Sequence, residues 1–156
     1  MLQIVFVCTG NTCRSPMAEA LLREKIGQAG MTDRITVSSA GMTAYGQMTA
    51  SRGAASAMER QGIDLSGHRS RLLTAQITAA AGLILTMTAE HKRIVLSIAP
   101  EAAEKVFTLT EFADDSGEVA DPYGGDTAVY QLCARQIRQL LDKSWEKIVA
   151  LAGKSN

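Results

Sequence analysis

The chain has 156 residues, a length typical of one domain with its own core, and we expect residues 1–156 to form a single domain. Its 16 acidic and 16 basic residues cancel, so the overall charge favours neither a nucleic acid nor an anionic membrane as partner. No apolar run approaches the ~20 residues of a membrane span, and three cysteines without a visible leader favour the reducing cytoplasm over a secreted disulfide framework.

Short apolar runs predict four buried strands, at residues 3–7, 35–38, 83–86 and 106–109. Segments with helical patterns separate these runs. Strands that alternate with helices indicate an α/β fold, in which a parallel sheet is covered by helices on both faces. Ligands of such folds lie beyond the carboxyl ends of the strands.

Capping signals and apolar spacing predict five helices. The first covers residues 16–29, with Pro16 at its first position and Gly30 after its end. Threonines are the expected N-caps of the other four, which cover 50–61, 75–80, 89–98 and the C-terminal segment; these caps are Thr49, Thr74, Thr88 and Thr127. Residues 63–73 and 113–127 are expected to be irregular. In the last helix an apolar stripe includes Val129, Cys133, Ile137, Leu140, Ser144, Ile148 and Leu151.

The turn between the first strand and the first helix is the candidate site. It has the sequence Cys-Thr-Gly-Asn-Thr-Cys-Arg-Ser over residues 8–15, which we call the cysteine loop. Backbone N–H groups of such a turn, together with the helix dipole, favour a bound anion. Gly10 and Asn11 tolerate the left-handed backbone that a tight anion nest needs. We expect phosphate to bind here.

Three side chains of the cysteine loop can carry chemistry. A thiol attacks phosphorus as thiolate, and a helix N-terminus and a nearby cation favour that form of Cys8. Arg14 offers a planar fork for two phosphate oxygens, and Ser15 can donate a hydrogen bond to the thiolate. A buried structural cysteine is the alternative, but the strand, turn and helix context favours catalysis.

Covalent phosphoryl transfer also needs a proton donor for the leaving group. The candidate is Asp121, because Pro122 stiffens the backbone after it and Gly124-Gly125 permits a close approach. Asp126 is the rival acid. Its alternative role, close to the start of the last helix, is capping.

These residues make the chain resemble the low-molecular-weight protein tyrosine phosphatase family, and in particular its bacterial protein arginine phosphatase branch. The resemblance covers essentially the whole chain. It is carried by the opening Val-Cys-Thr-Gly-Asn-Thr-Cys-Arg-Ser-Pro-Met-Ala-Glu-Ala and by four later segments: Ser39-Ala40-Gly41, Gly62-Ile63-Asp64-Leu65 with His68, Leu83-Ile84-Leu85-Thr86-Met87, and Asp121-Pro122-Tyr123-Gly124.

The resemblance implies a three-layer sandwich with a four-stranded parallel sheet and a phosphate-binding loop after the first strand. It implies a phosphatase that uses neither metal nor other cofactor and passes through a phosphocysteine. Cys8 would be the nucleophile, Arg14 the phosphate clamp, and Asp121 the acid and then the base. Phosphate would contact Thr9, Gly10, Asn11, Thr12, Cys13, Arg14 and Ser15. Hydrogen bonds among Asn11, Ser15, Ser39 and His68 would hold the loop.

The other two cysteines have different expected roles. By the resemblance, Cys13 would form a disulfide with Cys8 on oxidation and so protect Cys8 from over-oxidation. The alternative is that Cys13 is a small core residue. Cys133 lies on the apolar stripe of the last helix and is expected in the core.

Position 12 bears on the substrate. Tyrosine phosphatases of the family usually have Ile or Leu there, whereas this chain has Thr12, as in the arginine branch. A threonine leaves room for a guanidinium and can form a hydrogen bond with it, and Asp121 could pair with the same group. The alternative is a neutral variation in a tyrosine phosphatase. By the resemblance, Tyr123 forms one wall of the substrate pocket, and Tyr45 is the candidate for the other.

The expected partner is a phosphorylated protein, and the expected state is a monomer. Two other functions compete with the phosphatase. An arsenate reductase of this fold needs two further cysteines in the middle of the chain, and none lies between Cys13 and Cys133. A non-catalytic phosphate-binding module would have lost Cys8, Arg14 or Asp121, and all three are present.

Overall fold

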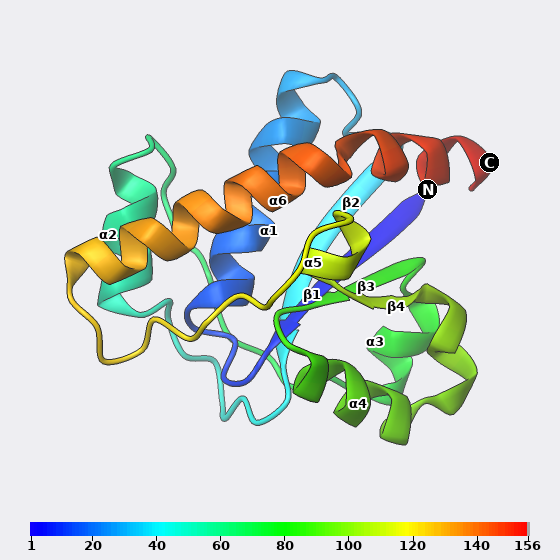
Figure 1. Ribbon diagram of the computed structural model, residues 1–156, viewed down its shortest axis with the longest axis horizontal. Coiled ribbons are helices and arrows are strands. Elements are labelled where there is room, and N and C mark those ends of the chain that lie inside the picture. The colour runs from blue at the N-terminus through cyan, green and yellow to red at the C-terminus, as the bar shows by residue number, and fades with distance from the viewer. Residues whose placement is uncertain (156) are drawn as a thin grey trace.

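The computed structural model describes residues 1–155 and is shown in Figure 1. Within these residues one parallel sheet has the strand order β2-β1-β3-β4. The strands are β1 (Leu2–Cys8), β2 (Ile35–Gly41), β3 (Leu83–Thr86) and β4 (Val106–Thr108). The four expected strands and the parallel sheet are therefore confirmed. β1 is central, since Val5 pairs with Ser38 on one side and with Ile84 on the other.

All five expected helices are present, together with two short ones that the sequence patterns did not predict. The expected ones are α1 (Arg14–Gln28), α2 (Arg52–Glu59), α3 (Ala75–Ala80), α4 (Ala89–Ile98) and α6 (Thr127–Lys154). The additional ones are the 3-10 helix η1 (Pro100–Lys105) and the single turn α5 (Leu109–Phe112).

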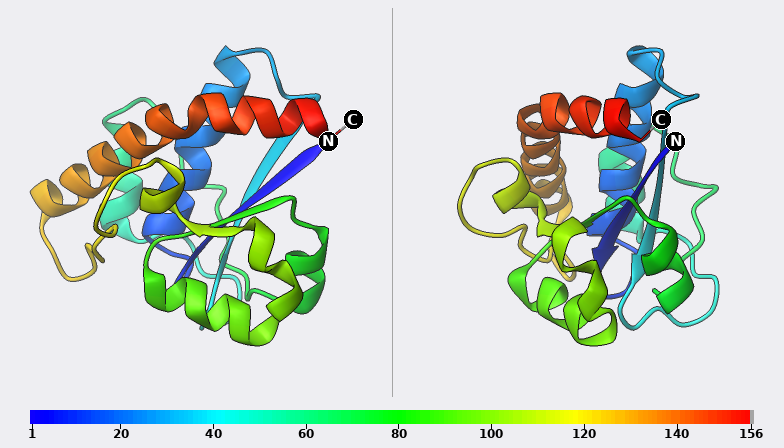
Figure 2. Two further views of the ribbon diagram at one scale, coloured as in Figure 1. Left: turned by 45° about the vertical axis from the view of Figure 1, so that its right-hand side comes forward. Right: turned by 90° about the vertical axis from the view of Figure 1, so that its right-hand side faces the viewer.

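The side chains of β1 alternate between two cores, as the period of two in a strand requires. Ile4 and Phe6 pack in a core with residues of α1, α2, α5 and α6. Val5 and Val7 pack in a second core with residues of α3, α4 and η1. Figure 2 shows helices on both sides of the sheet, so the three-layer sandwich is confirmed.

The helix starts differ from the expected ones in three places. α2 is capped by Ser51, whose hydroxyl accepts from Ala54 N at 3.2 Å, and not by Thr49. α6 is capped by Asp126, whose carboxylate accepts from Val129 N at 3.1 Å, so Thr127 is the first helical residue and not the cap. α1 begins at Arg14, which places Pro16 in the first turn but not at its start. The caps Thr74 and Thr88 are confirmed.

The helix α5 shortens the last strand. Thr108 and Glu111 form a capping box, in which the Thr108 hydroxyl accepts from Glu111 N and the Glu111 carboxylate accepts from Thr108 N. Leu109, expected in the strand, is therefore the first residue of α5 and is fully buried. The sequence Thr-Leu-Thr-Glu carried this signal.

The buried stripe of α6 is confirmed at Cys133 and at most of the other expected positions. Val129 is an exception and is exposed, while the adjacent Tyr130 is buried. The Tyr130 ring lies where a Cβ on Gly53 would stand, which brings α6 against α2. Among the described residues, no helix is both long enough and apolar enough to cross a membrane.

Candidate active site

The cysteine loop joins the end of β1 to the start of α1 at the carboxyl edge of the sheet. Asn11 has φ +57°, in the left-handed region that asparagine tolerates. Of the two residues that tolerate a left-handed backbone, Asn11 adopts it and Gly10 does not have a positive φ. A single left-handed residue is enough to turn this loop.

Asn11 is fully buried, and its side-chain amide and its backbone carbonyl are all hydrogen-bonded. Its Nδ2 donates to Ser15 Oγ and to Ser39 Oγ, both at 2.9 Å. Its Oδ1 accepts from the backbone N–H of Arg71 at 2.9 Å. Its carbonyl oxygen accepts from His68 Nε2 at 2.7 Å. The structure thus brings together Asn11, Ser15, Ser39 and His68, and these bonds hold the left-handed residue in place.

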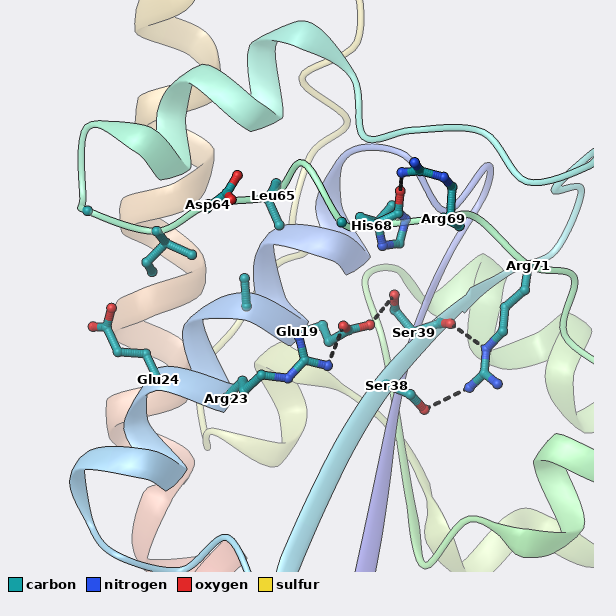
Figure 3. Close-up of a pocket in the computed structure, with 14 residues that line it drawn as sticks. Glu19, Arg23, Glu24, Ser38, Ser39, Asp64, Leu65, His68, Arg69 and Arg71 are labelled. Carbon is teal, nitrogen blue, oxygen red and sulfur yellow. Dashed lines mark hydrogen bonds and ion pairs between the residues drawn. The ribbon is translucent and has the colours of Figure 1, made fainter.

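Two further residues extend this set of hydrogen bonds and were missed by the sequence analysis. Glu19, on α1, accepts from Ser39 Oγ at 2.7 Å, and Arg71 Nε donates to the Ser39 carbonyl at 3.0 Å. Figure 3 shows both contacts at a pocket of about 600 Å³, which Glu19, Ser39 and Arg71 help to line. Glu19 lies one helical turn after Ser15, a spacing that could have indicated it.

The Cys8 sulfur lies 2.8 Å from Ser15 Oγ, and both residues are buried. Ser15 Oγ already accepts from Asn11 Nδ2, so its own proton is free to point at the sulfur. A hydroxyl aimed in this way can donate a hydrogen bond to the sulfur. The arrangement also places the sulfur at the N-terminus of α1, the positive end of the helix dipole.

The last residue of β2 lies against the cysteine loop. A Cβ on Gly41 would stand 2.8 Å from the Thr9 carbonyl oxygen and 2.9 Å from Asn11 N, which only a glycine avoids. Beyond it, Met42 N donates to the Cys8 carbonyl at 3.0 Å and Thr43 N to the Thr9 carbonyl at 2.9 Å. The loop is therefore held from β2 as well as from α1.

Arg14 connects the cysteine loop to the segment between α5 and α6. Its side chain is buried, with 4% of the residue exposed. Nη1 donates to the Val119 carbonyl at 3.0 Å, and Nη2 lies 3.7 Å from Asp121 Oδ2. Asp121 is half-exposed, and its Oδ1 accepts from Tyr123 N at 3.1 Å. The structure thus places the expected cation and the expected acid side by side.

A cavity of about 250 Å³ gathers the expected reactive groups. Its lining comprises Cys8, Thr9, Gly10, Thr12, Cys13, Arg14, Asp121 and Tyr123. Tyr123 is 78% exposed and stands at the rim. Tyr45 is 81% exposed and lies outside this lining, so its contact with substrate stays a prediction. Across the described residues, no cluster of three or more His, Cys, Asp or Glu side chains could hold a metal ion.

Cys13 contacts side chains of two other elements. Its thiol donates to Ser51 Oγ at 3.2 Å and lies 3.6 Å from Tyr130 OH. Cys8 and Cys13 are both free thiols, and their disulfide stays a prediction. Cys133 is buried as expected, and this burial raises the pKa of its thiol to about 12.

One histidine, which contacts the cavity residue Thr9, was missed altogether. His91, in the first turn of α4, has its Nε2 2.9 Å from Thr9 Oγ1. Burial lowers the pKa of His91 to about 4, and the positive charge of Arg14 acts in the same direction. The histidine is therefore neutral at physiological pH. Nothing in its own sequence neighbourhood pointed to Thr9, which lies 82 residues away.

Comparison with known proteins identifies this arrangement. The family model for low molecular weight phosphotyrosine protein phosphatases matches residues 3–153. The chain belongs to this family. Family membership makes it a cysteine-dependent phosphatase, and the solved structures of the family share its α/β fold, with the loop after the first strand.

Among the phosphatases of this family, two relatives carry different substrate names. A protein-arginine-phosphatase of Geobacillus stearothermophilus is 40% identical over 147 residues, which cover 94% of this chain and 95% of the relative. A probable low molecular weight protein-tyrosine-phosphatase, EpsP, of Ralstonia nicotianae is 35% identical over 148 residues, covering 95% and 97%.

A solved structure in the family bears on the chemistry. It is a mutant of the YwlE arginine phosphatase with a phosphorylated active site serine, and it matches with a TM-score of 0.89 and 37% identity. The match covers 94% of this chain and 95% of that one. A phosphorylated active-site residue in that protein indicates a mechanism in which the phosphoryl group is bound covalently to the enzyme before it is released.

Proposed function

We propose that this phosphatase removes phosphate from phosphoarginine in proteins. The observation that carries the proposal is the position of Thr12, which lines the same cavity as Cys8 and Asp121. The arginine phosphatase named above supports the same assignment. The alternative is a tyrosine phosphatase, which the EpsP relative favours.

The setting of Thr12 explains why it would discriminate between substrates. Its backbone carbonyl accepts from Ser51 N at 2.8 Å, so the start of α2 holds the position of the residue. A Cβ-branched side chain of this size leaves space that an isoleucine would fill, and its hydroxyl can pair with a guanidinium N–H. A site that forms a hydrogen bond with a polar group of its substrate strongly rejects analogues that lack this group. An apolar site rejects analogues with an extra polar group less strongly.

In the first half of the proposed reaction, the Cys8 thiolate attacks phosphorus. The S–P bond forms while the P–N bond to the arginine side chain breaks. Asp121 gives its carboxylic proton to the leaving nitrogen. Arg14 and the backbone N–H groups of the cysteine loop bind the phosphoryl oxygens, where negative charge develops.

In the second half, the Asp121 carboxylate takes a proton from a water molecule, whose oxygen attacks the phosphocysteine. The S–P bond breaks, inorganic phosphate leaves, and the sulfur departs as thiolate. The Ser15 hydroxyl, at 2.8 Å, donates to that thiolate and makes it a better leaving group. The arginine of the protein substrate has been released in the first half.

We further propose that residues 1–156 act as one domain, as a monomer and in the cytoplasm. The three free thiols support a reducing compartment. Sedimentation of the purified chain tests the oligomeric state, and a sedimenting dimer at working concentration would contradict it.

The substrate is tested by comparing kcat/KM for two peptides of the same sequence, one with phosphoarginine and one with phosphotyrosine. We expect the wild type to prefer phosphoarginine by at least roughly tenfold, about 1.4 kcal/mol. Thr12→Ile should reverse the preference, because the longer side chain occupies the guanidinium space and packs against a phenyl ring.

Matched variants separate the causes. Thr12→Val keeps the shape of the side chain and removes its hydroxyl. A lower preference for phosphoarginine in this variant therefore measures the contribution of the hydrogen bond from the hydroxyl to the guanidinium. Cys8→Ser should abolish turnover of both peptides, and its residual rate gives the background. If the wild type prefers phosphotyrosine, or if Thr12→Ile leaves the ratio unchanged, the phosphoarginine assignment is wrong.

A further inference from the structure

His91 is a buried histidine with 6% of the residue exposed, and it contacts a residue that lines the catalytic cavity. Thr88 caps the helix α4 and accepts from the backbone N of His91 at 3.1 Å, which fixes the histidine in the first turn. Its Nε2 lies 2.9 Å from Thr9 Oγ1. Thr9 directly follows Cys8 and lines the cavity. The imidazole is thus one side chain away from the phosphate site.

The two ring nitrogens have different surroundings. Nε2 pairs with Thr9, whereas Nδ1 is buried with no hydrogen-bond partner among residues 1–155. A neutral imidazole carries one proton, on one nitrogen or the other. A buried N–H without an acceptor is rarer than an acceptor left without a donor. The proton therefore belongs on Nε2, which donates it to Thr9 Oγ1.

Thr9 Oγ1 receives a second hydrogen bond from the other side. Arg14 Nη2 donates to it at 3.5 Å, and an arginine has no lone pair to accept with. With the lone pairs of the oxygen facing His91 and Arg14, the proton of the Thr9 hydroxyl points away from both. Thr9 also lines the cavity, so a proton that points away from both partners can reach an anion bound there.

We propose that His91 is a positioning residue, which orients the Thr9 hydroxyl so that it donates a hydrogen bond to an oxygen of the bound phosphoryl group. Thr9 then adds a side-chain donor to the backbone N–H groups and the guanidinium of the site. This hydrogen bond from Thr9 to the phosphoryl group does not depend on whether the phosphoryl group comes from arginine or tyrosine.

The charges around His91 keep it in the state that this role requires. Arg14 faces it from α1, Glu90 from α4, and Glu118 and Asp121 from the segment between α5 and α6. Burial is the largest effect on the pKa of His91 and lowers it; Arg14 lowers it further, and the three carboxylates oppose the shift. With a pKa of about 4, the ring of His91 is neutral at physiological pH and carries one proton, on either Nδ1 or Nε2.

A double-mutant cycle tests the proposal on the full chain with inorganic phosphate as competitive inhibitor. His91→Leu fills the space without a donor, and Thr9→Val removes the hydroxyl. Each should raise the inhibition constant of phosphate roughly tenfold, the size expected for one hydrogen bond to a charged group. The double variant should be no weaker than either single one, because both remove the same bond.

Two variants complete the cycle. His91→Gln can reach Thr9 with its amide N–H and should restore most of the phosphate affinity that His91→Leu loses. Arg93→Leu, at an exposed position of the same helix, is the matched control and should change nothing. Losses that multiply in the double variant, or phosphate affinity unaltered by His91→Leu, would overturn the proposal.

Nitrogen NMR of the wild-type protein gives a test that needs no variant. The His91 ring should show a protonated Nε2 and an unprotonated Nδ1 at neutral pH, since a histidine that merely fills space has no reason to fix this tautomer. A proton found on Nδ1 would contradict the proposal even if the variants failed to fold. The measurement is independent of the substrate, so it separates this inference from the phosphoarginine assignment.

Discussion

At the scale of single residues, two histidines hold the cysteine loop in different ways. His68 donates to the backbone carbonyl of Asn11 and so supports the course of the chain. His91 contacts a side chain, Thr9, and so affects the direction of one hydroxyl. The resemblance to a known family indicated His68. His91 stayed hidden because nothing in a helical pattern reveals a contact made across 82 positions.

The pKa of His91 predicts how the stability of the protein changes with pH. Its folded value of about 4 lies below the ordinary 6.5, so between these values the unfolded chain binds a proton that the folded protein does not. This histidine therefore lowers the free energy of unfolding as the pH falls from 6.5 to 4, by at most about 3 kcal/mol, and has no such effect above 6.5.

Urea unfolding of the wild type and of His91→Gln at pH 7, 6, 5 and 4 measures this effect. Carboxylates titrate in the same range, but they do so in both proteins, so the difference between the two curves isolates the histidine. We expect the wild type to lose more stability than the variant on acidification. Parallel curves would show that His91 protonates in the folded state near its ordinary pKa.

At the scale of elements, the contact of β2 with the cysteine loop has a direct consequence for Gly41. A Cβ there would meet the backbone of Thr9 and Asn11, which cannot move without shifting the loop. Gly41→Ala should therefore lower kcat/KM at least roughly a hundredfold, since small displacements of a catalytic group are costly. The measurement is turnover together with the melting temperature.

Gly27 is the matched control for that substitution. It lies near the end of α1, and a Cβ there would meet nothing within 4 Å. Gly27→Ala should leave turnover unchanged and stabilise the protein by up to about 1 kcal/mol, because alanine favours a helix. Equal turnover of Gly41→Ala and the wild type would mean that the cysteine loop can move to make room for the Cβ without loss of activity. The close contact at Gly41 would then not be needed for catalysis.

Local signals predicted most of the elements, and the misses have physical causes. Side-chain oxygens of Thr49 and Ser51 are both acceptable caps, and the choice of Ser51 depends on its backbone N–H, which donates to the Thr12 carbonyl. That bond joins α2 to the cysteine loop and is invisible in a local pattern. The miss at α5 has another cause, because the capping box from Thr108 to Glu111 is a local signal that can be recognised in the sequence and was overlooked.

At the scale of the whole molecule, alternating runs were enough to predict a parallel sheet with helices on both faces. The order of the strands places β1 in the centre, so the cysteine loop emerges at the middle of the carboxyl edge. The segment between α5 and α6 passes close to the start of α1 (Figure 1). In this segment, Asp121 Oδ2 lies 3.7 Å from Arg14 Nη2. The residues after Asp121 made it the candidate acid and the resemblance supported this choice, although 107 positions separate Asp121 from Arg14 in the sequence.

Because the cavity is formed by several elements of the fold, binding of an anion there should affect the stability of the whole protein. The cavity joins residues of β1, the cysteine loop and the segment before α6, so an anion bound there stabilises the folded chain over the unfolded one. At a phosphate concentration of ~100 Kd the gain is about 2.7 kcal/mol. For a chain of this size that corresponds to a rise of roughly 5 to 10 °C in melting temperature.

Arg14→Lys is the informative variant for this measurement. Lysine keeps the positive charge but loses the planar fork that binds two oxygens, so its shift on adding phosphate should be much smaller. Cys8→Ser keeps the fork and should keep most of the shift, although it has no thiol. Since each variant is compared with itself in sulfate-free and phosphate-free buffer, a lower starting stability does not affect the comparison. A full shift in Arg14→Lys would mean that phosphate stabilises the protein from another site, and the role of the guanidinium as the phosphate clamp would be wrong.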